Sequence, residues 1–320
     1  MTELALRPVA SRATHLLAIA TVVVALPLIL LGAEVTSKGV GMVDPVALRS
    51  PWYFGVEWMN NHGMGWLIEH GHRQVGWIVG MLAIATLAAA FWGDSRGWVR
   101  VLSAFALTAV IVQGLLGIFR IQLHALFGNS AALVHGSFAP IVLSVLLTLA
   151  LASARDWSVG EAKADKLRTL RIWSLATVAA TYAQIVFGGF IRHKDLLVAG
   201  RLHLIGAFVV FSFVWVVIKY AREANYESFK TLSRVLMALL TVQVLLGAEA
   251  WMAWMKRHFY PQAALEESAA MQLTRSAHYV VGAFIFATMV ALTVKAFWAP
   301  VHVSSLDVET AIKPGVALEG

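Results

Sequence analysis

Long apolar blocks alternate with short polar segments along almost the whole chain. Each block is close to the roughly 20 residues that an α-helix needs to cross the hydrocarbon core of a bilayer. The blocks predict eight membrane-spanning helices, at about 14–32, 66–92, 99–119, 131–152, 172–191, 202–220, 235–254 and 273–298. The sequence therefore predicts an all-α polytopic membrane protein.

Composition supports this prediction and narrows the chemistry. Of the 320 residues, 59% are hydrophobic and 13% are charged, whereas soluble domains are close to half apolar and about a quarter charged. An ordinary soluble protein and a disordered chain are both excluded. The chain has no cysteine, which excludes disulfides, thiolate metal sites and iron–sulfur clusters. Any redox chemistry must therefore use a bound cofactor.

The basic residues set the predicted orientation rather than indicating nucleic acid as a partner. With the N-terminus inside, the inner segments hold fifteen Lys and Arg, against five in the outer loops. Cytoplasmic segments of membrane proteins carry such an excess. We predict a multi-pass protein of the plasma (inner) membrane with both termini in the cytoplasm. The first helix lacks a signal-peptide cleavage site and is expected to be retained.

Short repeats relate the predicted helices to one another. The sequence LLGAE at 30–34 recurs at 245–249, and QGLLG at 113–117 resembles QVLLG at 243–247. Each even-numbered helix then opens with a histidine: His72, His135, His203 and His278. Copies that contain an even number of helices are parallel, which places all four histidines on the same outer side. The repeats predict two pseudo-symmetric four-helix bundles.

These bundles define the predicted organisation of the chain. Residues 1–13 form a cytoplasmic tail, and residues 14–154 form the N-terminal half. Residues 155–170 form a cytoplasmic linker, 171–298 the C-terminal half, and 299–320 a second cytoplasmic tail.

Four histidines at equivalent positions indicate haem ligation. A single histidine in a membrane helix is more often a hydrogen-bonded packing residue. Neutral imidazole is, however, the usual axial ligand of haem iron, and facing helices of a bundle can supply one imidazole to each face of a porphyrin. We predict two sites, His72 with His135 and His203 with His278, with haem iron as the only metal.

Arginines at the outer helix ends are candidates for binding the haem propionates. Arginine forms bidentate, charge-assisted bonds with carboxylates. The alternative for each is to snorkel to lipid phosphate. The candidates are Arg73, Arg120, Arg192, Arg201 and Arg275.

Glu69 is the candidate catalytic residue. On a helix it shares a face with His72 and Arg73, three and four residues further on, and the other three histidine segments have no carboxylate there. A carboxylate in a spanning region is costly and indicates function. The alternative is an ion pair with Arg73 that only neutralises both groups. The asymmetry predicts chemistry in the first half alone.

These motifs together resemble haem A synthase, a family of cytochrome oxidase assembly proteins. The resemblance rests on Glu69-x-x-His72-Arg73, Val134-His135-Gly136, Arg201-Leu202-His203, Thr274–His278 and the Thr36–Met42 stretch, and it extends from 14 to 298. It implies oxidation of a methyl group of haem O to the formyl group of haem A. His72 and His135 would hold haem O or haem A, His203 and His278 an electron-transferring haem b, and Glu69 would be catalytic. The chain would belong to the cysteine-free branch.

The resemblance also implies partners and leaves alternatives open. Haem O synthase, the cytochrome oxidase assembly machinery, an electron acceptor such as a quinone, and the lipid membrane are the expected partners, with homo-oligomerisation left open. The main alternative is a diheme b-type electron carrier, or a haem-handling assembly protein, without oxidation chemistry. A transporter is a third reading, but it predicts paired Gly/Pro interruptions at mid-membrane, and Pro27 and Pro140 are not at equivalent positions.

Overall fold

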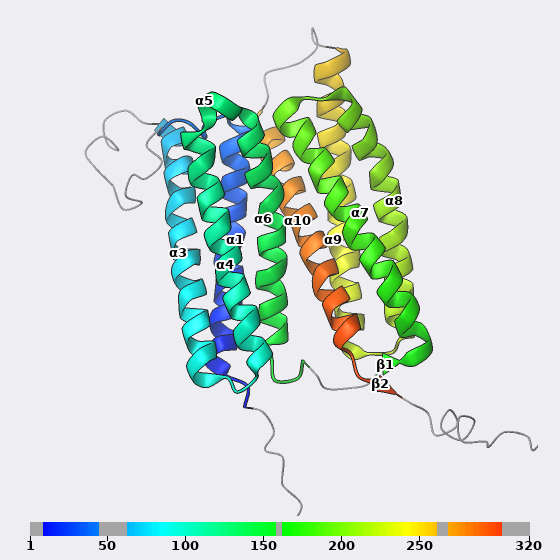
Figure 1. Ribbon diagram of the computed structural model, residues 1–320. Helices are drawn as coiled ribbons and strands as arrows, with labels where there is room; N and C mark the ends of the chain where they lie inside the picture. Colours follow the sequence, from blue (N-terminus) through cyan, green and yellow to red (C-terminus); the bar gives the residue numbers. More distant parts are fainter. Residues whose placement is uncertain (1–8, 45–62, 158–161, 261–267, 303–320) are drawn as a thin grey trace, which may run out of the picture.

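In the described part of the chain, eight long helices lie side by side as a bundle (Figure 1). The computed structural model describes residues 9–44, 63–157, 162–260 and 268–302. Parts of the predicted tails and linker lie outside these residues. So do Arg7, Arg49 and Lys313, three of the basic residues counted for the predicted orientation. The long helices are α1 (Arg12–Ser37), α3 (Gly63–Gly93), α4 (Gly97–Gln122), α6 (Asn129–Ala152), α7 (Ala164–Lys194), α8 (Leu197–Glu223), α9 (Glu227–Phe259) and α10 (Ala269–Trp298).

All eight helices are long and apolar enough to cross a membrane. The predicted all-α polytopic fold is therefore confirmed. The remaining described elements are short: a one-turn helix, α5 (His124–Phe127), and the parallel pair β1 (Ala162–Lys163) and β2 (Val301–His302).

Most helices extend beyond their apolar blocks into polar sequence. The largest extensions are in α7, which begins at Ala164 rather than near residue 172, and in α9, which spans Glu227–Phe259 rather than 235–254. Lys, Arg and Glu are good helix formers, so a helix already fixed in lipid continues through them. As a result, residues 164–170 of the predicted linker are helical.

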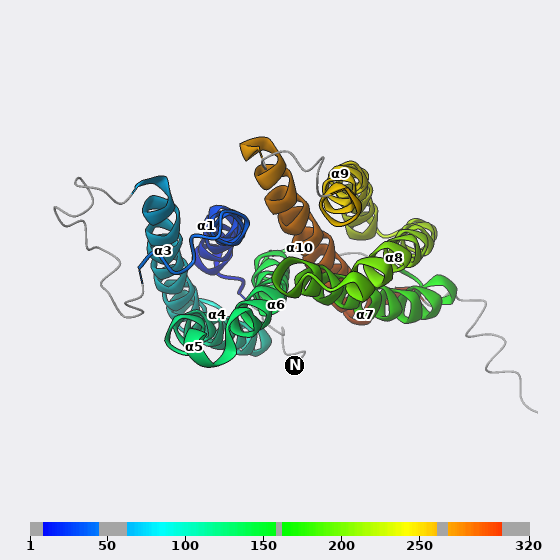
Figure 2. The same cartoon turned by 90° about the horizontal axis from the view of Figure 1, so that it is seen from above.

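The helices gather into two groups of four, with α1, α3, α4 and α6 on one side and α7 to α10 on the other (Figure 2). The contacts α1–α3, α3–α4, α4–α6 and α1–α6 have counterparts in α7–α8, α8–α9, α9–α10 and α7–α10. Each group has its own apolar core. The predicted pseudo-symmetry and the domain bounds nevertheless stay predictions.

A third apolar cluster joins the two groups at the centre. It consists of Ile29, Leu143, Ala283 and Ala287, from α1, α6 and α10. Small residues allow helices to approach closely inside a membrane. The groups are thus packed against each other through these three helices.

A buried ion pair fixes the end of the first group opposite the histidines. Arg96 donates to both carboxylate oxygens of Asp94, over 2.8 and 2.9 Å, and also to the carbonyl of Ser153 over 2.7 Å. The backbone N–H of Ser11 donates to Asp94 over 3.0 Å. One ion pair therefore ties the start of α1 and the end of α6 to the α3–α4 turn.

Candidate functional site

Each of the four predicted ligand histidines packs against a glycine of the long helix that precedes it. A Cβ placed on that glycine would lie 2.8–3.2 Å from the Cε1 atom of the histidine, closer than the ordinary carbon contact of about 3.5–4.0 Å. The pairs are Gly32 with His72, Gly117 with His135, Gly188 with His203, and Gly247 with His278. The repeated glycine step is the place where each helix admits an imidazole ring.

Two of these rings are oriented by a backbone carbonyl one turn before the glycine. The Nδ1 atom of His72 lies 2.9 Å from the carbonyl oxygen of Leu28, and Nδ1 of His203 lies 3.0 Å from that of Gln184. A carbonyl oxygen can only accept, so Nδ1–H is the donor. Nε2 then keeps its lone pair, which is the form in which imidazole binds a metal.

Glutamine stands four residues before the glycine in three of the four repeats. Gln184 Nε2 donates to the backbone carbonyl of His203 over 2.6 Å, and Gln113 Nε2 to that of His135 over 3.2 Å. The amide nitrogen of Gln243 lies 3.3 Å from Nε2 of His278. The sequence showed these glutamines only as part of a repeat. Each glutamine is four residues before the glycine, and this spacing places the two residues on the same helix face. The spacing is the feature of the sequence that could have indicated them.

A cavity of about 700 Å³ lies inside the first group of helices. Residues of α1, α3, α4 and α6 form its wall, and residues of α7 and α10 complete it. Both His72 and His135 line it. Ligand pockets have volumes of about 300–1,000 Å³. The predicted N-terminal histidine pair is therefore brought together at a cavity of suitable size.

Glu69 is buried and lines the same cavity. Its Oε1 atom accepts from Arg73 over 2.8 Å, and its Oε2 atom accepts from the backbone N–H of Asp44 over 3.0 Å. Arg73 also donates to the carbonyl oxygen of Asp44 over 2.7 Å. The ion pair considered for Glu69 and Arg73 is therefore present. Asp44 was not expected, because no motif in the sequence singles it out.

Two further arginines reach the polar end of the cavity. Arg120 of α4 packs against Gly41, where there is no room for a Cβ, and makes no hydrogen bond or ion pair with the described residues. Arg192 of α7 donates to the carbonyl oxygen of Ala33 over 2.5 Å and to Ser37 Oγ over 2.6 Å. A residue of the second group thus contributes to the cavity of the first.

The other predicted propionate ligands lie elsewhere. Arg201 is exposed near the start of α8, and Arg275 is half-buried in α10, and neither lines the cavity. By contrast, His193 does line it, next to Arg192. His193 has no counterpart in the histidine repeat, so no pattern in the sequence indicates it. The propionate role of each arginine stays a prediction.

The second histidine pair also comes together. The ring centroids of His203 and His278 are 6.2 Å apart, and the rings are inclined by 70°. Neutral imidazoles from facing helices are the usual protein ligands of haem iron. The residues therefore fit one haem iron held between them.

Tyr279 connects the two histidine sites. It follows His278 in α10, and its hydroxyl donates over 2.7 Å to the carbonyl oxygen of Gly136, the residue after His135. It also lines the large cavity. The residue after His278 is therefore hydrogen-bonded to the residue after His135.

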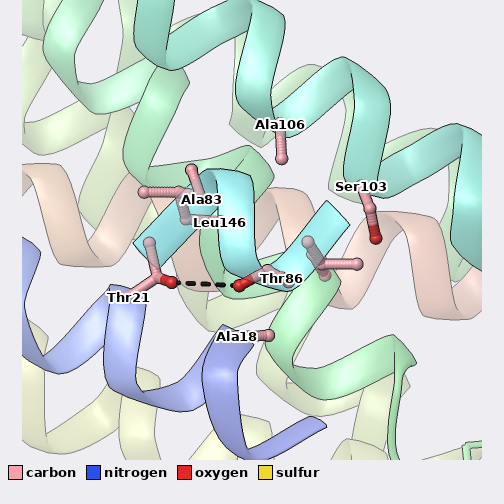
Figure 3. Close-up of a pocket in the computed structure, with 8 residues that line it drawn as sticks. Ala18, Thr21, Ala83, Thr86, Ser103, Ala106 and Leu146 are labelled. Carbon is pink, nitrogen blue, oxygen red and sulfur yellow. Dashed lines mark hydrogen bonds between the residues drawn. The ribbon is translucent and has the colours of Figure 1, made fainter. Parts of the chain in front are cut away.

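A much smaller cavity lies further along the same bundle, lined by Thr21, Thr86 and Ser103 among other residues (Figure 3). Its volume of about 10 Å³ is near the lower limit for a single water molecule. The hydroxyl oxygens of Thr21 and Thr86 are 3.4 Å apart, and each hydroxyl donates to its own helix. This cavity is a packing feature rather than a ligand site.

Comparison with known protein families gives one match. A family model described as cytochrome oxidase assembly protein matches residues 55–202. The matched segment includes Glu69, His72 and His135 and ends just before His203, so it is shorter than the 14–298 region over which the motifs resemble the family. No curated protein matches the chain.

Proposed function

Since this chain belongs over residues 55–202 to the cytochrome oxidase assembly family, we propose that it is a haem A synthase, which oxidises a methyl group of haem O to the formyl group of haem A. One observation supports this most directly. A buried carboxylate, Glu69, and two imidazoles, His72 and His135, line a single cavity in the lipid-embedded part of the protein.

The substrate would be held through its iron and its propionates. His72 presents Nε2, because its Nδ1–H is bound to the Leu28 carbonyl, and His135 faces the same cavity. Arg120 is the stronger propionate candidate, since its guanidinium lines the cavity and forms no hydrogen bond or close ion pair with the described residues. Arg192, although bound to α1, adds a second positive charge at this end. Both cations would orient the porphyrin edge toward the outer side.

The C-terminal pair would hold a haem b. That group would supply one-electron transfer between the substrate site and an acceptor, a quinone or another carrier. His203 is already oriented for ligation by its bond to the Gln184 carbonyl. Tyr279 holds the His278 segment against the His135 segment. The residues around the second pair thus fix both the ligands and their distance from the first site.

Conversion of a methyl to a formyl group with water as the oxygen source releases four electrons and four protons. Positive charge develops at the carbon as electrons leave it, and a fixed carboxylate in a low-dielectric cavity stabilises such charge. Glu69 suits this role because Arg73 and the Asp44 N–H hold its two oxygens in place. The same carboxylate is a candidate to accept a proton from attacking water.

One observation favours the alternative of a diheme electron carrier or haem-handling assembly protein. Both oxygens of Glu69 already accept hydrogen bonds, so the carboxylate is satisfied without any substrate. In that case Glu69 would serve only to hold Asp44 and the segment after α1 against α3. Replacement of Glu69 separates the two functions.

The experiment is expression in a bacterial host that contains a haem O synthase but lacks its own haem A synthase. Extracted haems are then identified by chromatography and mass. We expect haem A or its hydroxylated precursor from the wild-type chain, none from Glu69→Gln, and unchanged product from the control Glu249→Gln, whose carboxylate contacts only Thr274 among the described residues. Haem O that stays unconverted in a folded, haem-loaded wild-type protein would exclude the synthase and support the carrier.

A further inference from the structure

The large cavity continues well beyond the polar end that holds Glu69. From Glu69 to Ile84 along α3 the lining extends about 22 Å, and from Arg120 to Leu107 along α4 about 20 Å, at 1.5 Å per residue. We call the part lined by residues 76–84 and 107–115 the inner limb. Among the described residues that line it, none is ionisable. Apart from Gln113, the inner limb is lined by apolar residues and glycines of two spanning helices, so the cavity ends in a largely apolar channel.

The inner limb is lined by apolar side chains of α3 and α4 that the rest of the described protein leaves largely uncovered. Its lining residues Trp77, Met81 and Ile84 of α3, and Ile111 and Leu115 of α4, have exposed fractions between 45% (Leu115) and 59% (Trp77). On each helix these residues are three or four apart, so they form a stripe along one face. The two stripes border the channel. In a membrane, the exposed parts of these side chains would contact the lipid hydrocarbon.

Two glycines keep the space between these stripes open. Gly80 of α3 and Gly114 of α4 both line the inner limb, and a Cβ placed on either would meet no atom within 4 Å. Small residues in membrane helices usually let two backbones approach each other. Gly80 and Gly114 do not have this role, because no neighbouring helix lies within 4 Å of where their Cβ atoms would be. Their effect is to widen a slot rather than to close a helix contact.

We propose that this slot binds the long isoprenoid chain of the substrate porphyrin and admits that chain sideways from the lipid. The inference rests on the proposed function and adds a subsite to it. Haem O carries such a chain and haem B does not, although the two share the same macrocycle and propionates. The slot would therefore distinguish the substrate from the more common haem.

Continuity with the histidine site favours this occupant over a lipid acyl chain. The inner limb begins at Gly76, one helical turn from His72, and belongs to the same cavity as the two histidines. A ligand whose planar head reaches His72 and His135 would carry its apolar tail directly into the slot. A lipid would fill the slot without any connection to the histidines.

The test uses haem binding rather than turnover. Haem O and haem B are titrated separately into purified full-length protein, followed by absorption spectra, and the His72→Ala protein supplies the baseline of the second site. Gly80→Leu and Gly114→Leu fill the slot with side chains. Gly97→Leu is the matched control, since Gly97 also has open space at its Cβ but does not line the cavity.

We expect wild-type protein to bind haem O at least tenfold more tightly than haem B at the first site. Both slot variants should lose this preference while keeping wild-type affinity for haem B, and Gly97→Leu should keep it. Equal affinities in wild-type protein, or a preference that survives in both slot variants, would overturn the subsite and leave the synthase proposal standing. Loss of a co-purifying lipid from the slot variants, with haem O binding unchanged, would assign the slot to lipid instead. No binding of either haem above the His72→Ala baseline would overturn the synthase proposal itself.

Discussion

Replacement of Gly32 by alanine adds one methyl group where α1 touches the ring of His72. The new Cβ would lie 2.8 Å from Cε1 and 3.2 Å from Nδ1 of the ring. Carbon atoms in ordinary contact are about 3.5–4.0 Å apart, so the ring must move by roughly 1 Å. That displacement takes Nδ1 away from the Leu28 carbonyl, now 2.9 Å distant. The ligand would lose both its position and the bond that orients it.

The energetic cost follows from three opposing effects. Overpacking costs about 1–3 kcal/mol, and the lost hydrogen bond about 0.5–1.5 kcal/mol. Alanine recovers about 0.5–1 kcal/mol over glycine in a helix interior. A net destabilisation of about 2 kcal/mol is expected. Loss of an orienting contact typically lowers metal affinity by about 10–100-fold, and we expect that loss for haem at the first site.

The assay is a spectral titration of purified protein with haem B, which lacks the isoprenoid chain assigned to the slot, read at the first site as the signal absent from His72→Ala. Gly80→Ala is the control, because it adds the same methyl group in a helix that lines the same cavity but meets nothing within 4 Å. It should bind haem as the wild type does. Wild-type affinity in Gly32→Ala, or an equal loss in Gly80→Ala, would refute the argument that the glycine seats the imidazole.

Three further predictions concern the ion pair, the bridge and the arginines. Arg96→Ala should lower the free energy of unfolding by about 3–5 kcal/mol because it strands a buried carboxylate, as measured by denaturation in detergent. Burial raises the pKa of Asp94, but the hydrogen bonds from Arg96 and from backbone N–H groups outweigh it and hold the pKa below its usual value. The contribution of this ion pair to stability is therefore complete above about pH 4 and is lost only as the pH falls further. Arg96→Ala should accordingly lower the free energy of unfolding by the same amount at about pH 8 and about pH 5, and a loss that shrinks over this range would contradict the prediction. Tyr279→Phe removes the hydrogen bond to the Gly136 carbonyl and should lower the free energy of unfolding by about 0.5–1.5 kcal/mol. The thermal transition temperature should fall with it, and an unchanged temperature would show that this hydrogen bond adds no stability. Arg192→Gln should weaken haem binding at the first site about 10–100-fold while Arg201→Gln leaves it unchanged, and equal effects would refute their different placement.

The number and type of the helices could be predicted because each spanning segment carries its own signal. About 20 apolar residues in succession exclude other structures in lipid, whatever the rest of the chain does. Helix ends were less predictable. The α7 helix continues into the charged segment from Ala164, since hydropathy marks where a helix leaves the hydrocarbon and not where its hydrogen bonding stops.

The histidine sites were predictable in part, because they repeat. Each of His72, His135, His203 and His278 has a glycine partner in the structure, and the sequence shows that glycine step before each histidine-bearing helix. Repetition identifies a ligand candidate without the need to know which helices are neighbours. It gives no information about residues that occur only once, and Asp44 is such a residue.

Contacts between the two groups of helices could not be predicted for the same reason. Arg192 and His193 follow the second group's glycine step, so the repeat would assign them to the second site. In the structure α7 packs beside α6, Arg192 donates to α1, and both residues line the first cavity. Ser37 of α1 lies 2.9 Å from Ser276 of α10, and Lys194 of α7 donates to Ser130 of α6 over 2.6 Å. The polar end of the first site is thus built from both groups. Because of these contacts, the first group of helices alone would lack part of its own cavity wall, and the second group has a structural role in the first site besides the electron transfer proposed for it.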